Sequence, residues 1–230
     1  MLSRGVTWAI LAIALSFQAA MEWYRWYWGL PPMPVIHTAI AAVAIFVAII
    51  MWRRSASQAD RLQLGRRGEI TVGQMLEELR SDGFRVFHDL AEEGYNIDHV
   101  IIGPPGVFVI ETKTLSMPEG RKNTIHFDGQ KVLINGRMPD RDPIEQVRAC
   151  TDRVGEILKR TTGRSAPMRP VVLYPGWWVE RQPKGADVWV LNPKALSEFL
   201  RHEQVRLSES DVTFFASALE THLKANAGTA

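Results

Sequence analysis

Two acidic residues and one lysine lie in a pair of β-branched runs that flank the segment Gly-Pro-Pro-Gly at 103–106. Asp98 belongs to the first run, and Glu111 and Lys113 belong to the second. Such runs around a tight turn predict an antiparallel hairpin. A symmetric turn would place Asp98 opposite Glu111, and side-chain alternation would place Lys113 on the face of Glu111. The three side chains are therefore expected to form one cluster.

This cluster has the composition of a site for a hard divalent cation, Mg²⁺ or Mn²⁺. Asp98 and Glu111 would bind the ion, and the backbone carbonyl of Thr112 would be a third ligand from the protein. Lys113 would orient or deprotonate the attacking water, or stabilise charge that develops on a phosphate. Cys150 has no cysteine partner and the histidines lack ligand spacing, so a zinc site is not expected.

The alternative is a buried salt bridge between Lys113 and one of the two carboxylates. Such a pair leaves one negative charge without compensation, which is costly in a medium of low dielectric constant. That excess charge favours a bound cation, but residue spacing alone leaves both interpretations open.

Two apolar segments near the N-terminus, 6–21 and 34–52, predict a transmembrane hairpin. The second has 19 residues, which as a helix would span roughly 28 Å, close to the hydrocarbon thickness of a bilayer. The aromatic residues between Trp23 and Trp28 suit an interfacial loop, with an aromatic core as the alternative. A lipid bilayer is therefore an expected partner.

The arginines that follow the second apolar segment indicate orientation. Arg53 and Arg54 flank it directly, whereas the loop between the two segments holds only Arg25. Both ends of the hairpin are thus expected in the cytoplasm, with the C-terminal domain on the cytoplasmic side of the inner membrane. The single Cys150 excludes an intramolecular disulfide and agrees with this compartment. Residues 61–230 carry equal numbers of basic and acidic residues, which argues against nonspecific coating of nucleic acid.

The remaining sequence predicts an α/β domain with a mixed sheet flanked by helices. The early strands should pair antiparallel, and a later strand should be added by a helical crossover. Tryptophans 177, 178 and 189 favour the core or its rim, with stacking platforms for single strands as the alternative. The predicted strands are 84–90, 96–102, 107–113, 124–127, 131–134, 171–174 and 188–191, and the predicted helices are 68–80, 144–160, 193–201 and 211–224.

Five short motifs resemble the nuclease-related domain, NERD, over about residues 64–175. They are Gly-Arg-Arg-Gly-Glu at 65–69, Val-Phe-His-Asp-Leu at 86–90, Asn-Ile-Asp-His-Val-Ile-Ile-Gly at 96–103, Gly-Val-Phe-Val-Ile-Glu-Thr-Lys at 106–113 and Asp-Pro-Ile-Glu-Gln-Val at 142–147. This family is similar to the PD-(D/E)xK nucleases. The resemblance implies a restriction-endonuclease-like core.

The resemblance also implies a role for each matching residue. Asp98 and Glu111 match the metal-binding acids, and Lys113 matches the catalytic lysine. Glu69 matches an acid of the first helix. From position alone, Glu69 is either a first-turn residue favoured by the helix dipole or a group aimed at a site, and the resemblance favours the site. Gln146 matches a glutamine that would hydrogen-bond near the site or to the substrate.

The predicted organisation is a two-span hairpin at 1–54, a linker at 55–63, a nuclease core at 64–175 and an extension at 176–230 that packs on the core. The expected function is metal-dependent hydrolysis of phosphodiester bonds in DNA, with RNA as a second candidate substrate and no nucleotide cofactor. The alternative is a catalytically inactive, membrane-tethered module that binds nucleic acid or acts as a scaffold.

Overall fold

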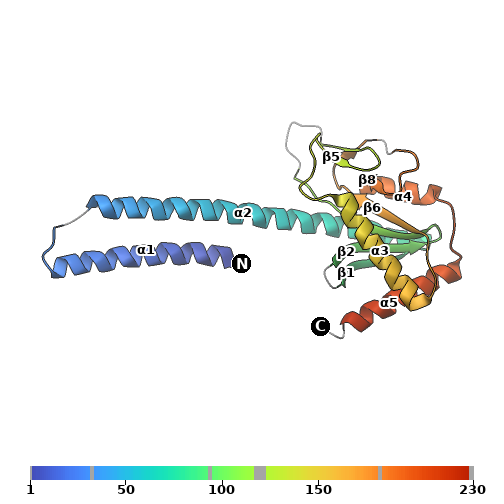
Figure 1. Ribbon diagram of the computed structural model, residues 1–230, viewed down its shortest axis with the longest axis horizontal. Helices are drawn as coiled ribbons and strands as arrows, with labels where there is room; N and C mark the ends of the chain where they lie inside the picture. Colours follow the sequence, from blue (N-terminus) through green and yellow to red (C-terminus); the bar gives the residue numbers. More distant parts are fainter. Residues whose placement is uncertain (1, 32–33, 93–94, 117–122, 181–182, 228–230) are drawn as a thin grey trace. The chain divides into compact units, whose positions relative to one another are not determined.

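The computed structural model describes the backbone of residues 2–31, 34–92, 95–116, 123–180 and 183–227. Side chains are described for these residues except 2–12, 34, 35, 37, 51–67, 91, 92, 95, 226 and 227. The chain divides into two units, Met1–Gln63 and Leu64–Ala230. Figure 1 shows helices alone in the first unit and an α/β arrangement in the second.

The first unit contains α1 (Leu2–Tyr27) and the first part of α2 (Pro34–Glu78), with a turn between them. The helix α1 continues through most of the aromatic segment that was expected to be a loop, so only Trp28 lies in the turn. The aromatic segment contains no glycine or proline before Gly29, which has φ +64° and lets the N–H of Leu30 donate to the carbonyl of Arg25 at 3.0 Å.

Among the residues that the structure describes, no helix is long and apolar enough to cross a membrane. Part of each predicted span lies outside the described side chains, namely residues 6–12 of the first span and 34, 35, 37, 51 and 52 of the second. The two predicted transmembrane spans are therefore not supported. Residues 55–63, the expected linker, lie within α2.

The second unit begins in the last part of α2. Val72 and Leu76 of this helix are buried, as the predicted apolar stripe requires. A short 3₁₀ helix, η1 (Leu79–Asp82), follows directly. Gly83 ends it with φ +85°, a conformation that glycine adopts without steric cost.

A five-stranded mixed sheet forms the centre of the second unit. The strand order is β1-β2-β3-β6-β8, with the first three strands antiparallel and the last two added in parallel. This arrangement confirms the prediction of a mixed α/β fold. The strands are β1 (Arg85–Glu92), β2 (Tyr95–Gly103), β3 (Gly106–Thr112), β6 (Met168–Leu173) and β8 (Trp189–Leu191).

The register of the β2–β3 hairpin agrees with the prediction from the symmetric turn. Val100 pairs with Val109, and Ile102 pairs with Val107. The turn ends at Gly106, which has φ +145°, and a Cβ there would lie 2.7 Å from the carbonyl oxygen of Pro167. Only glycine fits this position.

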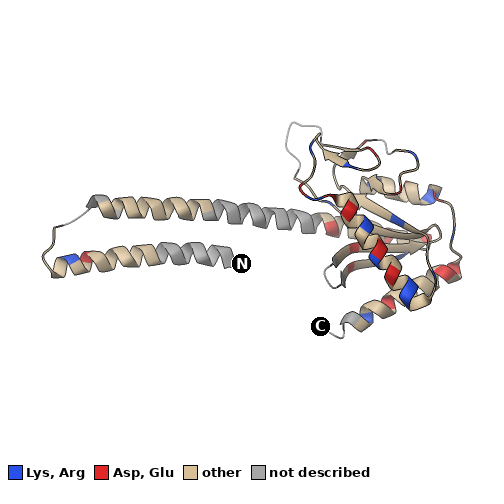
Figure 2. Cartoon of the chain, viewed as in Figure 1, with Lys and Arg blue, Asp and Glu red and all other residues tan. Residues whose placement is uncertain are grey.

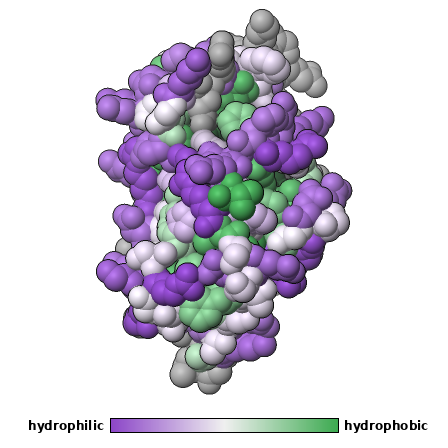
Figure 3. All heavy atoms as spheres, turned by 90° about the vertical axis from the view of Figure 1, so that its right-hand side faces the viewer, coloured by the Kyte–Doolittle hydropathy of each residue, from purple (hydrophilic) through white to green (hydrophobic). Residues whose placement is uncertain are grey.

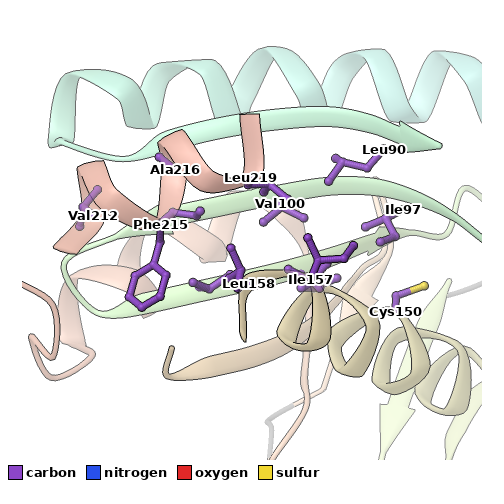
Figure 4. Close-up of a cluster of buried hydrophobic side chains, with 14 of the residues drawn as sticks. Leu90, Ile97, Val100, Cys150, Ile157, Leu158, Val212, Phe215, Ala216 and Leu219 are labelled. Carbon is purple, nitrogen blue, oxygen red and sulfur yellow. The ribbon is translucent and has the colours of Figure 1, made fainter. Parts of the chain in front are cut away.

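The crossover helix α3 (Pro143–Thr162) and the C-terminal helix α5 (Glu209–Ala227) cover one face of the sheet. Their side chains form a core with those of β1 to β3, and Figure 4 shows Ile157 and Phe215 on the side of the sheet where Val100 lies. On the other face, the end of α2 and the helix α4 (Pro193–His202) share a second core with the sheet. The sheet is therefore buried on both faces.

A second, smaller sheet has the order β5-β4-β7. It consists of β4 (Thr124–Phe127), β5 (Val132–Ile134) and β7 (Trp178–Val179). The hairpin of β4 and β5 was predicted from Asp128-Gly129. The strand β7 was missed because two residues are too few for a periodic pattern. This sheet packs over a third core that includes Ile125 and Trp177.

Candidate functional site

Asp98 and Glu111 lie on the two strands of the central hairpin, where β2 begins and β3 ends. Both are buried, with 8% and 5% of their surface exposed. Continuing the register beyond His99 and Ile110 places Asp98 opposite Glu111. One carboxylate oxygen of Asp98 accepts from the backbone N–H of Thr112 at 2.7 Å. The two acids are thus fixed by the backbone of the hairpin.

Lys113 joins this pair from the end of β3. Its Nζ lies 2.6 Å from Oε1 of Glu111 and 2.8 Å from Oε1 of Gln146. Gln146 is in the first turns of α3, which begins at Pro143 after the side chain of Asp142 accepts from the N–H of Ile144. The structure therefore brings four predicted site residues together, and Gln146 holds the lysine rather than a carboxylate.

The site has more negative than positive charge. Burial, and after it the charge of Glu111, raises the pKa of Asp98 to about 7, because the N–H of Thr112 and the charge of Lys113 offset only part of their effect. One ammonium thus does not compensate for two buried carboxylates.

Glu69 approaches the site from α2 and is half-buried. After burial and Glu111, its charge also raises the pKa of Asp98. The preceding residue, Gly68, lies against the end of β3, because a Cβ there would lie 1.8 Å from Oγ1 of Thr114. This close approach positions Glu69 beside the cluster.

A backbone irregularity in β1 faces Asp98. The β1–β2 register pairs His88 with His99 and Leu90 with Ile97, so Asp89 lies across from Asp98. Asp89 has φ +50°, a left-handed conformation that aspartate tolerates better than most residues. Residue spacing does not predict this conformation, and its one signal in the sequence is the residue type itself.

His99 lies on the other face of the sheet from Asp98, as alternation requires. Its Nδ1 is 2.8 Å from Nδ1 of His88, whose Nε2 is 2.7 Å from a carboxylate oxygen of Glu77. Burial lowers the pKa of His99 to about 4, and the neighbouring His88 adds to this effect. A neutral, structural histidine fits this environment.

Two further residues that sequence reasoning did not assign to the site lie near its charges. Burial raises the pKa of Cys150 to about 11, with smaller contributions from Glu111 and Asp98. Burial also raises the pKa of Tyr174, with contributions from Asp142 and Glu111. Cys150 is one helical turn beyond Gln146, and Tyr174 directly follows β6, so these two residues belong to the apolar surroundings of the site.

Within the described residues, no group of three or more histidine, cysteine, aspartate or glutamate side chains could hold a metal ion. A site here would therefore use the two carboxylates, backbone oxygen and water, which is a usual arrangement for Mg²⁺. The carbonyl of Thr112 stays a predicted ligand.

The chain thus combines a mixed α/β fold with two buried carboxylates, one of them paired with the half-buried Lys113, at one edge of the central sheet. Residues 64–175 match the family model of the nuclease-related domain, NERD. No curated protein and no solved structure gives a match to the chain. The family match supports the NERD family for this part of the chain and suggests a nuclease-related function.

The contact of Gly68 with Thr114 yields a testable prediction. Gly68→Ala is expected to lower stability by about 1–3 kcal/mol and to reduce any activity of the site, because the added methyl group displaces α2 and Glu69. Thermal unfolding would measure the first effect. Gly73→Ala is the matched control, since its Cβ would make ordinary contacts at 3.7 Å with His88 and gain helix propensity. A Gly68→Ala variant as stable as Gly73→Ala would contradict the prediction, and Thr114→Gly should restore stability.

Proposed function

We propose that this chain is a nuclease that hydrolyses phosphodiester bonds of DNA with Mg²⁺ or Mn²⁺. The observation that supports this function is that the two buried carboxylates of Asp98 and Glu111 share one half-buried ammonium, that of Lys113, so ionisation of both acids would leave one negative charge uncompensated. Such a charge is costly unless a proton or a cation is present. The match of residues 64–175 to NERD supports a nuclease-related function in general.

The donor set fits a hard divalent cation. Asp98 and Glu111 offer carboxylate oxygens, which Mg²⁺ and Mn²⁺ prefer. A bound ion would neutralise the phosphate and supply hydroxide near neutral pH. The raised pKa of Asp98, to about 7, is consistent with a carboxyl that lacks a sufficient cationic neighbour.

The other residues of the site would position groups around the reacting phosphate. Gln146 holds Nζ of Lys113 at 2.8 Å, so the ammonium stays at the end of β3. From there Lys113 would orient the attacking water or stabilise negative charge on the phosphate. Glu69 would add a further acceptor for water on the side of α2.

A cleavage assay tests this proposal. We expect the purified full-length chain to cut DNA in Mg²⁺ or Mn²⁺ and to stop when EDTA removes the metal. Linear, circular and single-stranded DNA and RNA, compared in one assay, would identify the substrate and the mode of cutting. Cutting that continues unchanged in EDTA would contradict a metal-dependent mechanism.

One observation favours a second candidate, an inactive module that binds nucleic acid or acts as a scaffold. Lys113 and Glu111 form an ion pair at 2.6 Å, as expected if the cluster is a structural salt bridge instead of a metal site. On this reading the cluster is structural, and Mg²⁺ should neither stabilise the chain nor support cleavage. Turnover that depends on Lys113 would exclude this candidate.

We also propose that the first unit attaches the chain to a lipid bilayer, with the nuclease domain on the cytoplasmic side. Large apolar side chains of the first unit are exposed, among them Ile13, Phe17, Trp26, Val43 and Phe46. The described parts of α1 and of the first half of α2 carry few charges (Figure 2). By contrast, the face of the second unit that Figure 3 shows is mostly hydrophilic, with apolar residues in small groups. Extended exposed apolar surface is typical of an interaction site. Flotation of the full-length chain with liposomes would test the attachment.

A further inference from the structure

An exposed tryptophan lies beside a groove that the proposed active site does not use. Trp178, in β7, has 72% of its surface exposed, whereas Trp177 has 2%. Of the three tryptophans predicted for the core or its rim, Trp177 and Trp189 are buried and Trp178 is exposed. An indole ring in water exposes a large apolar area. Its position in the fold indicates a use for that area.

The segment that carries Trp178 leaves the central sheet at the same edge as the proposed active site. The strands β3, β6 and β8 are parallel, so their carboxyl ends meet at one edge. Lys113 follows β3, the segment with Trp178 follows β6, and Asn192 follows β8. In parallel sheets, ligands bind outside the carboxyl ends of the strands.

Hydrogen bonds tie the tryptophan segment to the chain that leaves the site. Nε1–H of Trp177 donates to the carbonyl of Leu115, two residues after Lys113, at 3.4 Å. The backbone N–H of Trp178 donates to the carbonyl of Asn123 at 2.9 Å. These bonds fix the backbone at Trp178 beside described residues of the segment that follows Lys113.

The groove beside Trp178 has a volume of about 690 Å³ and is bounded by β7, β8 and the start of α4. Asn192 keeps its wall in place, because its Nδ2–H donates to the carbonyl of Trp177 at 2.8 Å and its Oδ1 accepts from the N–H of Lys194. Apolar surface from Leu191 and Phe199 lines the groove, and the exposed Lys194 adds one cation. A planar aromatic ring and a cation together suit a nucleotide.

The charges of the groove indicate whether the phosphate or the base of a nucleotide would contribute more to binding. Glu180 is paired with His126 at 2.6 Å, and Glu198 supplies a further carboxylate that opposes Lys194. Attraction to phosphate is therefore small, and the stacking face would provide most of the binding. Stacking on an aromatic side chain requires a base that is not already stacked within a duplex.

We propose that Trp178 stacks on an unpaired base of the DNA substrate, while Lys194 contacts the adjacent phosphate. This inference rests on the proposed nuclease function and specifies its substrate. The chain would bind DNA with a single-stranded segment that runs from the active site along the carboxyl edge of the sheet. Duplex ends, flaps and single strands would then bind more tightly than continuous duplex.

A binding experiment on the full-length chain tests this proposal. Fluorescence anisotropy in EDTA would compare a labelled single-stranded oligonucleotide with a duplex of the same length. Trp178→Ala is expected to weaken binding of the single strand by about tenfold, since stacking contributes about 1–3 kcal/mol per base. Binding of the duplex should change by less than about twofold on the same basis.

Matched variants separate stacking from other causes. Trp178→Phe keeps an aromatic ring and should retain most of the binding. Phe214→Ala removes an exposed aromatic ring from α5 and should leave binding unchanged. Lys194→Gln should weaken binding less than Trp178→Ala and should reduce its dependence on salt.

The outcomes distinguish this inference from the proposed nuclease function. Unchanged binding in Trp178→Ala, or equal affinity for single strand and duplex, would overturn the stacking proposal while Mg²⁺-dependent cleavage by the native chain still supports the nuclease. If the native chain neither binds DNA nor cuts it, both proposals fail. Selective loss of single-strand binding in Trp178→Ala would support the inference.

Discussion

Lys113→Met is expected to slow phosphodiester hydrolysis at saturating Mg²⁺ by ~10²–10⁴-fold. Nζ of this lysine lies 2.6 Å from Oε1 of Glu111, and Gln146 holds it there at 2.8 Å. Removal of a positioned proton-transfer group or of an ammonium that stabilises developing charge has effects of this size. Initial rates on a labelled DNA substrate, measured over a range of Mg²⁺ concentrations, would provide the comparison.

Two control variants make this result interpretable. Lys113→Met leaves Glu111 buried without its partner, which can cost roughly 3–5 kcal/mol of stability. Lys113→Arg keeps the charge and the ion pair, so it should fold while remaining slow, because guanidinium does not donate or accept protons as an amine does. Lys159→Met makes the same charge change at an exposed position of α3 and should cut at the native rate. Native rates in both Lys113 variants would rule out a catalytic role.

Asp98→Asn is expected to abolish metal-dependent cleavage and, at the same time, to stabilise the fold above neutral pH. Asparagine keeps an oxygen that can accept from the N–H of Thr112, but it carries no charge beside Glu111. In the native chain the pKa of Asp98 is raised from 3.8 to about 7. A shift of this size corresponds to on the order of 4 kcal/mol of lost stability when the carboxyl is ionised.

The sign of the pH dependence follows from proton binding. Between pH 4 and pH 7 the folded chain holds a proton on Asp98 that the unfolded chain has released, so native stability falls as the pH rises through this range. Asp98→Asn has no carboxyl to ionise at this position, so its stability should not show this fall with rising pH. Denaturant unfolding in EDTA should therefore show similar stabilities at about pH 4 and a more stable variant at about pH 8.

Metal addition provides the complementary measurement. Mg²⁺ should raise the melting temperature of the native chain at pH 8 and leave that of Asp98→Asn unchanged, because a ligand that binds only the folded state stabilises that state. A variant that is less stable than the native chain at pH 8, or one that Mg²⁺ stabilises equally, would contradict the assignment of Asp98.

The central hairpin could be predicted because local rules determine it. Alternation and a four-residue turn fix the pairing of Val100 with Val109, and with it the face that Asp98 and Glu111 share. The crossover helix and the parallel strand after it also followed from the order of elements. Local rules therefore predict the proximity of only those site residues that belong to this hairpin.

The other features depend on contacts between distant segments. The contact of Gly68 with Thr114 and the hydrogen bond from Lys113 to Gln146 join residues 46 and 33 positions apart, and residue spacing contains no signal for them. The left-handed Asp89 and the two-residue strand β7 are too local to give a periodic pattern. The loop expected at the aromatic residues was inferred from composition, which does not determine where α1 ends.

The hydrogen bond between Lys113 and Gln146 joins the two ends of a long segment of the chain. The residues between them build β4 and β5, which belong to the small sheet and contribute to the third core. The entropy of closing such a loop grows only with the logarithm of its length. Insertions and deletions in this segment can therefore change the surface beside the site at small cost, while the lysine and its partner keep their positions. Changes in the segment between Lys113 and Gln146 can therefore alter substrate preference while the residues proposed for catalysis stay in place.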